Sequence, residues 1–155
     1  MVKDNNTSIS ICILRLSSIG DVTHIIPIIS TIRSVYPKSR ISWVIGKTEY
    51  ELVKNLKNIY FIIEDKKKTL DSILDMRSLF KNNQFDVVFH MQKSLRSKLI
   101  GNIINGRVNV TFNDIETKGS HVIDHFFSFL EKINIKKRVI DWQCEDILCN
   151  NNQFI

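Results

Sequence analysis

The sequence predicts an α/β fold in which a parallel sheet carries helices on both of its faces. Apolar runs typical of buried strands alternate with segments whose apolar residues recur at helical spacing. No two of these runs are joined by a hairpin turn signal, and 155 residues suffice for one domain with its own core. Alternation of strands and helices implies parallel pairing through right-handed crossovers, so we expect a Rossmann-like sheet.

The individual elements follow from the apolar pattern in chain order. Runs rich in aliphatic, β-branched and aromatic residues predict strands at 9–14, 40–46, 59–63, 85–90 and 108–112. Helical spacing predicts helices at 22–35, 47–58, 70–82, 93–105 and 122–133. We expect Gly106 to end the fourth of these helices as a C′ glycine, and Cys12 to be a small core residue of the first strand.

Composition narrows the class of protein. Apolar residues make up 43% of the chain, and no apolar run approaches the roughly 20 residues that cross a bilayer. The polar N-terminus does not look like a secretory leader, and three cysteines without metal-ligand spacing favour a reducing, cytoplasmic setting. The net charge of +6 suits a phosphorylated substrate, an anionic membrane surface or nucleic acid, or follows simply from a composition rich in Lys and Asn.

A short polar loop follows the first predicted strand, at the position where an open α/β sheet forms its ligand crevice. The loop contains Ser17, Ser18, Gly20 and Asp21 and leads into the first helix. Asp21 can cap free N–H groups at the start of that helix. The same carboxylate, facing the crevice, can instead take a proton from a substrate hydroxyl. Spacing alone leaves both interpretations open.

Two groups of cations follow other predicted strands. Lys93 and Arg96 come after the fourth strand and its terminal His90, where an anionic ligand could bind near the start of the next helix. The alternatives are a solvated helix face and a core histidine. The lysine run 66–68 follows the third strand, either as a solvated charge run or as a partner for a negatively charged ligand.

The segment 17–22 (SSIGDV), with His24 and Pro27, resembles the opening signature of the lipopolysaccharide heptosyltransferases, glycosyltransferase family 9. The run 90–96 (HMQKSLR) resembles a subset of the same family, and the similarity extends from Ile9 to about Trp142. The family's loop aspartate is the proposed catalytic base, so the resemblance gives that role to Asp21. The positions that the resemblance assigns to acceptor binding are Ser17, Ser18, Gly20, His24, Lys66, Lys67, Lys68, Gln92, Lys93 and Arg96.

The resemblance implies the N-terminal, acceptor-binding half of a GT-B glycosyltransferase. We expect a Rossmann-like domain over 8–138, a tail or truncated interdomain linker over 139–155, and no donor domain in this chain. The implied reaction transfers heptose with inversion from ADP-heptose to a Kdo–lipid A type glycolipid, without metal or cofactor. It would take place in the cytoplasm, peripherally on the inner face of the inner membrane. The chain is expected to be inactive alone, or to work with a separately encoded donor domain.

Other functions fit the residues less well. A non-catalytic module that binds an anionic glycolipid is the main alternative. Nucleic-acid binding would depend on charge alone, because no helix-turn-helix, RNP or zinc signature is present. A dinucleotide-binding oxidoreductase is excluded, because the first turn has one glycine instead of Gly-x-Gly-x-x-Gly and the second strand ends without an acidic residue.

Overall fold

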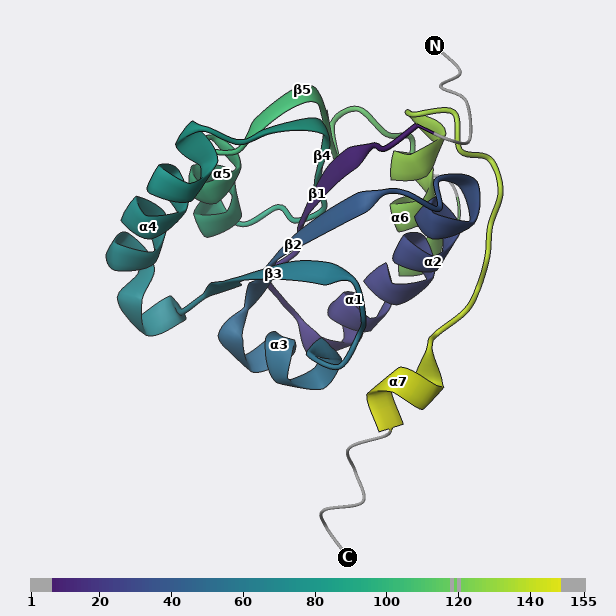
Figure 1. Ribbon diagram of the computed structural model, residues 1–155, viewed down its shortest axis with the longest axis horizontal. Helices are drawn as coiled ribbons and strands as arrows, with labels where there is room; N and C mark the ends of the chain where they lie inside the picture. The colour runs from purple at the N-terminus through teal and green to yellow at the C-terminus, as the bar shows by residue number, and fades with distance from the viewer. Residues whose placement is uncertain (1–6, 118, 120, 149–155) are drawn as a thin grey trace, which may run out of the picture.

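A five-stranded parallel sheet forms the centre of the molecule (Figure 1). The computed structural model describes residues 7–117, 119 and 121–148. The strands are β1 (Ser10–Leu14), β2 (Arg40–Gly46), β3 (Ile59–Glu64), β4 (Gln84–His90) and β5 (Asn105–Thr111). They lie in the order β3-β2-β1-β4-β5, and all four pairings are parallel, as the sequence predicts. β1 is therefore central, and the segments that follow β1 and β4 leave the sheet side by side.

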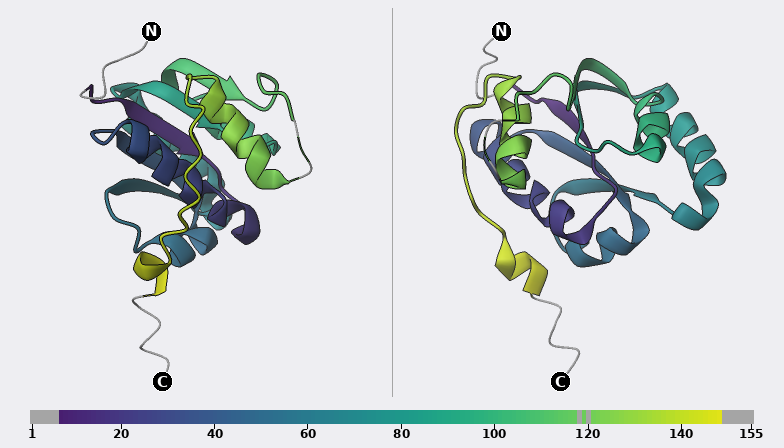
Figure 2. Two further views of the ribbon diagram at one scale, coloured as in Figure 1. Left: turned by 90° about the vertical axis from the view of Figure 1, so that its right-hand side faces the viewer. Right: turned by 180° about the vertical axis from the view of Figure 1, so that it is seen from behind.

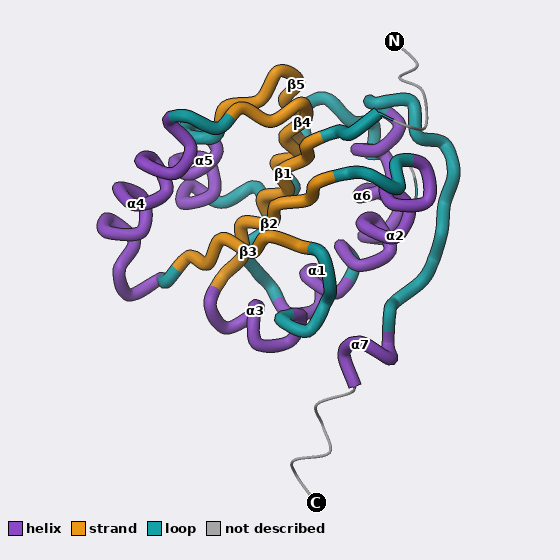
Figure 3. Tube along the Cα trace, in the orientation of Figure 1, coloured by secondary structure: helices purple, strands orange, loops and turns teal. Residues whose placement is uncertain are grey.

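Helices cover both faces of the sheet (Figure 3). One face carries α1 (Ile19–Thr23), α2 (Ile25–Val35), α3 (Lys47–Val53) and α6 (Val122–Glu131), whose apolar residues join the larger core cluster. The other face carries α4 (Thr69–Lys81) and α5 (Leu95–Gly101), which pack over a smaller cluster. Two short elements, η1 (Lys66–Lys68) and α7 (Cys144–Leu148), complete the described chain.

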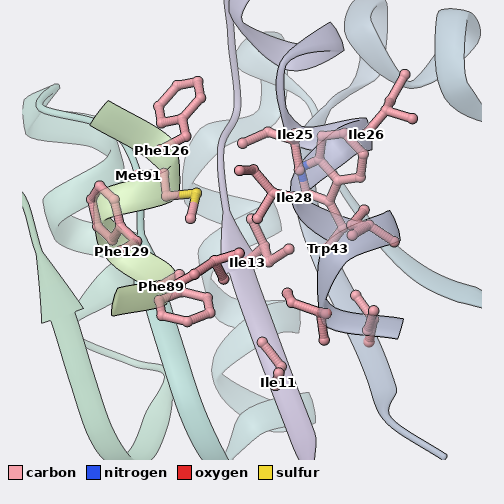
Figure 4. Packing of buried hydrophobic residues seen from close by; sticks show 14 of the residues in the cluster. Ile11, Ile13, Ile25, Ile26, Ile28, Trp43, Phe89, Met91, Phe126 and Phe129 are labelled. Atoms are coloured by element: carbon pink, nitrogen blue, oxygen red, sulfur yellow. The ribbon is translucent and has the colours of Figure 1, made fainter. Parts of the chain in front are cut away.

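Alternation along β1 divides the core into these two clusters. Ile11 and Ile13 point into the larger cluster, where they lie among Trp43, Phe89 and Phe129 (Figure 4). Cys12 and Leu14 point to the opposite face, as the two-residue period of a strand requires. Cys12 is fully buried, which confirms its predicted core position, and burial raises the pKa of its thiol.

Three predicted helices are wrong in extent. The expected helix 47–58 is shorter, because α3 ends at Val53. The expected continuous helix 22–35 is divided at His24 into α1 and α2. The expected helix 93–105 is shorter, because α5 ends at Gly101 and Asn102 is its C-cap. Gly106 is therefore not a C′ glycine: it lies in β5 opposite Phe85 of β4, so pairing with the neighbouring strand outweighs the local stop signal.

Residues 139–148, which we call the strap, run along the outside of α2 (Figure 2). The hydroxyl of buried Thr31 donates to the carbonyl of Val139 and accepts from its N–H, at 3.2 and 2.9 Å. Gln143 donates to Ser30, and Lys57 pairs with Asp146 of α7 at 3.1 Å. The remainder of the predicted 139–155 tail, 149–155, lies outside the described residues.

The outer edge of β5 is polar. Arg107 and Asn109 are exposed on this strand, and the side-chain amide of Asn109 donates to the carbonyl of Gly106 at 3.2 Å. Arg107 also forms an ion pair with Asp86 of β4, at 3.6 Å.

Across the described ranges, no helix has the length and apolarity needed to cross a membrane.

Close packing between α5 and β4 makes Gly101 sensitive to substitution. A Cβ at this position would come within 2.8 Å of Nδ1 and 2.9 Å of Cε1 of His90. We predict that Gly101→Ala lowers the free energy of unfolding by about 1–3 kcal/mol, as overpacking typically does. Urea unfolding followed by circular dichroism measures the effect. Gly20→Ala, whose added Cβ meets no heavy atom within 4 Å, is the matched control and should not destabilise; equal stability of the two variants would contradict the packing argument.

Candidate functional site

The loop after β1 presents Asp21 at the carboxyl edge of the sheet. Ser18, not Asp21, is the N-cap of α1, so the capping interpretation of Asp21 is wrong. Asp21 lies in the first turn, and 32% of its side chain is exposed. Its Oδ2 accepts hydrogen bonds from the Arg15 guanidinium and from the Ser18 hydroxyl, the latter at 3.3 Å.

Arg15 is the principal residue of this site that the sequence analysis missed. Its side chain is only 11% exposed, although it carries a charge. Nη2 bonds Asp21, Nη1 donates to the carbonyl of Met91 after β4, and the guanidinium lies 5.4 Å from the ring centroid of Phe126. Burial lowers the pKa of Arg15, and the neighbouring Asp21 carboxylate acts in the opposite direction. A charged residue directly after an apolar strand was the available signal.

Backbone bonds fix Arg15 itself. Its N–H donates to the carbonyl of Val44 in β2 at 3.1 Å, and its carbonyl accepts from the indole N–H of Trp43 at the same distance. Met91, which follows β4, donates its N–H to Leu14 at 3.0 Å. The backbone of Arg15 is thus held by β2 and its guanidinium by the segment after β4, and the guanidinium in turn holds the direction of the Asp21 carboxylate.

Gln92 joins the loop after β4 to the loop after β1. Its Oε1 accepts from the N–H groups of Leu16 and Ser17 at 2.7 and 3.3 Å, and its Nε2 donates to the hydroxyls of Ser17 and Ser94 at 3.3 Å each. These four bonds use the whole amide, so Gln92 acts here as a clamp on the Asp21 loop. The structure thereby brings Ser17, Ser18, Gly20, Asp21 and Gln92 together.

Both hydrogen bonds that the Asp21 carboxylate accepts from described residues end on the same oxygen, Oδ2. Oδ1 is left for a group that arrives from outside the chain. A carboxylate that is fixed on one oxygen and open on the other can accept a proton from a hydroxyl placed within hydrogen-bond distance. This arrangement is what a general base requires.

His24 lies at the junction of α1 and α2, and its ring packs among aromatic side chains. Its Nδ1 lies 2.8 Å from the carbonyl oxygen of Gly20, in the Asp21 turn. The ring meets Trp142 of the strap edge-on at 5.7 Å between centroids and lies 6.5 Å from Phe126. These contacts give His24 a role in holding the turn, while its predicted contact with an acceptor stays a prediction.

The predicted basic residues do not gather in one place. Lys66, Lys67 and Lys68 form η1 at the end of edge strand β3, two strands away from β1. Arg96 pairs at 3.6 Å with Glu64, whose side chain is fully buried at the end of β3. Arg96 therefore has an internal partner, and Glu64 is a second charged residue that the sequence analysis missed.

Lys93 takes the opposite direction from Arg96, toward β5. Its ammonium lies 4.8 Å from the ring centroid of Phe112, which follows that strand.

In the described ranges, no group of three or more His, Cys, Asp or Glu side chains is arranged to hold a metal ion.

His90 is half-buried at the end of β4 and belongs to the packing between β4 and α5. Its Nε2 lies 3.1 Å from the hydroxyl of Ser97, which itself donates to the carbonyl of Ser94 at 2.8 Å. The Ser97 oxygen therefore accepts, so Nε2 carries the proton of a neutral ring. Burial, with a smaller contribution from the charge of Lys98, lowers the pKa of His90.

Comparison with solved structures identifies the fold class of this chain. The fold is shared with a glycosyltransferase family 9 structure from Veillonella parvula, at a TM-score of 0.72 and 18% identity over 86% of this chain and 44% of that one. It is also shared with the heptosyltransferase WaaC of E. coli in complex with ADP. The TM-score is 0.74 and the identity 15%, over 91% of this chain and 53% of that one. The predicted fold class, a Rossmann-like half of a GT-B glycosyltransferase, is confirmed by this match over about half of each structure.

A comparison of sequences finds a curated relative with higher identity than these structures. The chain is 31% identical to the lipopolysaccharide core heptosyltransferase OpsX of Haemophilus influenzae, over 86% of its own length and 43% of the relative. No protein-family model matches the chain. The chain is thus a homologue of one part of a lipopolysaccharide core heptosyltransferase, and it spans less than half the length of that relative.

The environment of His90 predicts a pH dependence of stability. In the unfolded chain His90 titrates near the ordinary pKa of about 6.5, whereas the folded chain takes up that proton only at lower pH. The unfolded state therefore binds more protons, and stability falls as the pH drops from about 6.5 through the lowered pKa. We predict that His90→Gln loses less stability than the parent between pH 7.5 and 5.5 in urea unfolding. The other histidines are common to both proteins, so an identical loss would rule out His90 as the source.

Proposed function

We propose that this chain forms the acceptor-binding half of an inverting heptosyltransferase of lipopolysaccharide core synthesis, with Asp21 as the general base. The observation that carries the proposal is the Asp21 carboxylate at the carboxyl edge of the sheet, held on Oδ2 by buried Arg15 and open on Oδ1. Homology to a lipopolysaccharide core heptosyltransferase supports the same assignment.

The proposed chemistry is a direct displacement. Oδ1 of Asp21 accepts the proton of an acceptor hydroxyl while the hydroxyl oxygen attacks the anomeric carbon of the donor. The new glycosidic bond forms on the face opposite the breaking bond, and the nucleoside diphosphate leaves with that electron pair. Arg15 and Gln92 contribute by holding the carboxylate and its loop in one orientation, which avoids reorganisation during the reaction.

Donor and acceptor follow from relatives and from charge. The E. coli enzyme was solved with ADP and with ADP-2-deoxy-2-fluoro heptose, which supports ADP-heptose as the donor class here. A Kdo–lipid A type acceptor carries negative groups, and the cations at the carboxyl edge suit them. Such an acceptor lies in a membrane, so the proposal includes peripheral association with the cytoplasmic face of the inner membrane. Donor contacts would come from a further domain, in the same polypeptide or a separate one.

A second function fits part of the same geometry. The exposed lysines of η1 would serve a module that binds an anionic glycolipid without chemistry of its own. The open Oδ1 of Asp21 is what distinguishes the catalytic proposal from this one, because a binding module has no need of a fixed base.

A transfer assay separates the two functions. The chain, joined to the part of the Haemophilus heptosyltransferase that it does not cover, is given ADP-heptose and Kdo–lipid A, and product is counted by mass spectrometry. We predict that Asp21→Asn lowers turnover by roughly 10²–10⁴-fold, the usual contribution of a general base. Asparagine can still accept from Arg15, so folding and acceptor binding should survive.

Asp75→Asn, which removes an exposed acid of α4, is the matched control and should transfer at the parent rate. The unjoined chain is expected to give little or no product. Equal turnover of Asp21→Asn and the parent would refute the base. A joined protein that folds and binds the acceptor but forms no product would instead favour the binding module.

A further inference from the structure

A groove separates α5 from the segment that ends β5, on the face of the sheet that carries α4 and α5. Its volume is about 570 Å³, within the range of pockets that bind small molecules. Its walls include His90, Lys93, Lys98, Asn102, Phe112 and Asn113. Three strand or helix ends thus contribute cations, amides and an aromatic ring to one concave surface.

The two lysines of this groove differ from the cations that have ion pairs. Arg15, Arg96 and Arg107 pair with carboxylates, and so do Lys57 and Arg138. Neither Lys93 nor Lys98 has an ion pair with any residue in the part of the chain that the structure describes. The ring of Phe112 holds the ammonium of Lys93 at the groove without neutralising its charge.

The acid that follows the groove in sequence offsets only part of this positive charge. Asp114 accepts from the N–H and the hydroxyl of Thr111 at 2.7 and 2.8 Å, and these bonds lower its pKa, so it is one ionised carboxylate against two lysines. His90 is neutral near pH 7, because burial lowers its pKa. Two cations in a concave, partly apolar surface attract an anion more strongly than the same cations on a flat one.

We propose that this groove binds the anionic group of a sugar, a carboxylate or a phosphate, through Lys93 and Lys98. The amides of Asn102 and Asn113 line the same walls and suit the hydroxyls of that sugar. Gln92 also lines the groove and is bonded to Ser17 in the Asp21 loop, so one side chain connects the groove to that loop. The identity of the sugar as part of the acceptor rests on the proposed function; the anion site itself does not.

Titration of the ¹⁵N-labelled chain by NMR tests the site directly. The probes are free Kdo as a sugar acid, inorganic phosphate, and glucose as an uncharged sugar. We expect Kdo, phosphate or both to shift the backbone amides of Lys93, Lys98 and Asn113, and glucose to leave them unmoved. Binding should weaken as salt is added.

Charge-removing variants decide whether these lysines are responsible. Lys98→Gln and Lys93→Gln should each weaken anion binding about tenfold, the effect of one hydrogen bond to a charged group. Lys137→Gln, an exposed lysine outside the groove, should bind as the parent does. Equal thermal midpoints of all variants show that folding is intact.

The outcomes separate this site from the proposed function. Weaker anion binding in the Lys93 and Lys98 variants supports the site. Whether Kdo or phosphate binds then identifies the anionic group as a carboxylate or a phosphate. Unchanged affinity in both variants, or shifts confined to residues 66–68, would overturn it even if transfer by the joined protein is confirmed. Anion binding in the groove with no transfer would leave the site standing and refute the catalytic proposal alone.

Discussion

The candidate site depends on a buried positive charge at the end of the central strand. Arg15 is almost enclosed, and a buried guanidinium is stable only where its donors find partners. Its two terminal nitrogens find them: Nη2 in Asp21 from its own loop and Nη1 in the carbonyl of Met91 after β4, while the ring of Phe126 from α6 lies against the guanidinium. One side chain therefore joins the β1 loop, the β4 loop and a helix. The direction of the Asp21 carboxylate is a consequence of that enclosure.

Local patterns in the sequence were sufficient to predict the fold, but they misplaced several helix boundaries. Apolar runs predicted all five strands within three residues at each end. The inner strands β1, β2 and β4 are largely buried and appear as short apolar runs, whereas β5, most of whose residues are exposed, was predicted to start at 108 instead of Asn105. The break at His24 and the end of α5 were missed. The break had a local signal, because Pro27 has no N–H to donate to the carbonyl of Thr23, the last residue of α1. The end of α5 had none, because Ile103 and Ile104 continue the helical spacing past Gly101.

The candidate site, like the fold, was predictable in part. The turn around Asp21 was predictable, because a strand, a glycine-containing loop and a helix define a crevice position. The residues that contact this turn could not be predicted from the sequence. Arg15 and Glu64 were passed over because a charged residue beside an apolar run indicates that a partner is needed but not which group supplies it. Arg96 and Lys93 are three positions apart in sequence, yet one turns to a buried carboxylate at β3 and the other to an aromatic ring at β5.

The polar edge of β5 bears on how this sheet behaves beside other chains. An unpaired strand edge offers its N–H and C=O groups as a template for further strands and so invites aggregation. Here exposed Arg107 places a charge on the edge strand, and the side-chain amide of exposed Asn109 is bonded within the strand, to the carbonyl of Gly106. Polar side chains at this edge therefore make it a poorer template for edge-to-edge polymerisation than an apolar strand would be.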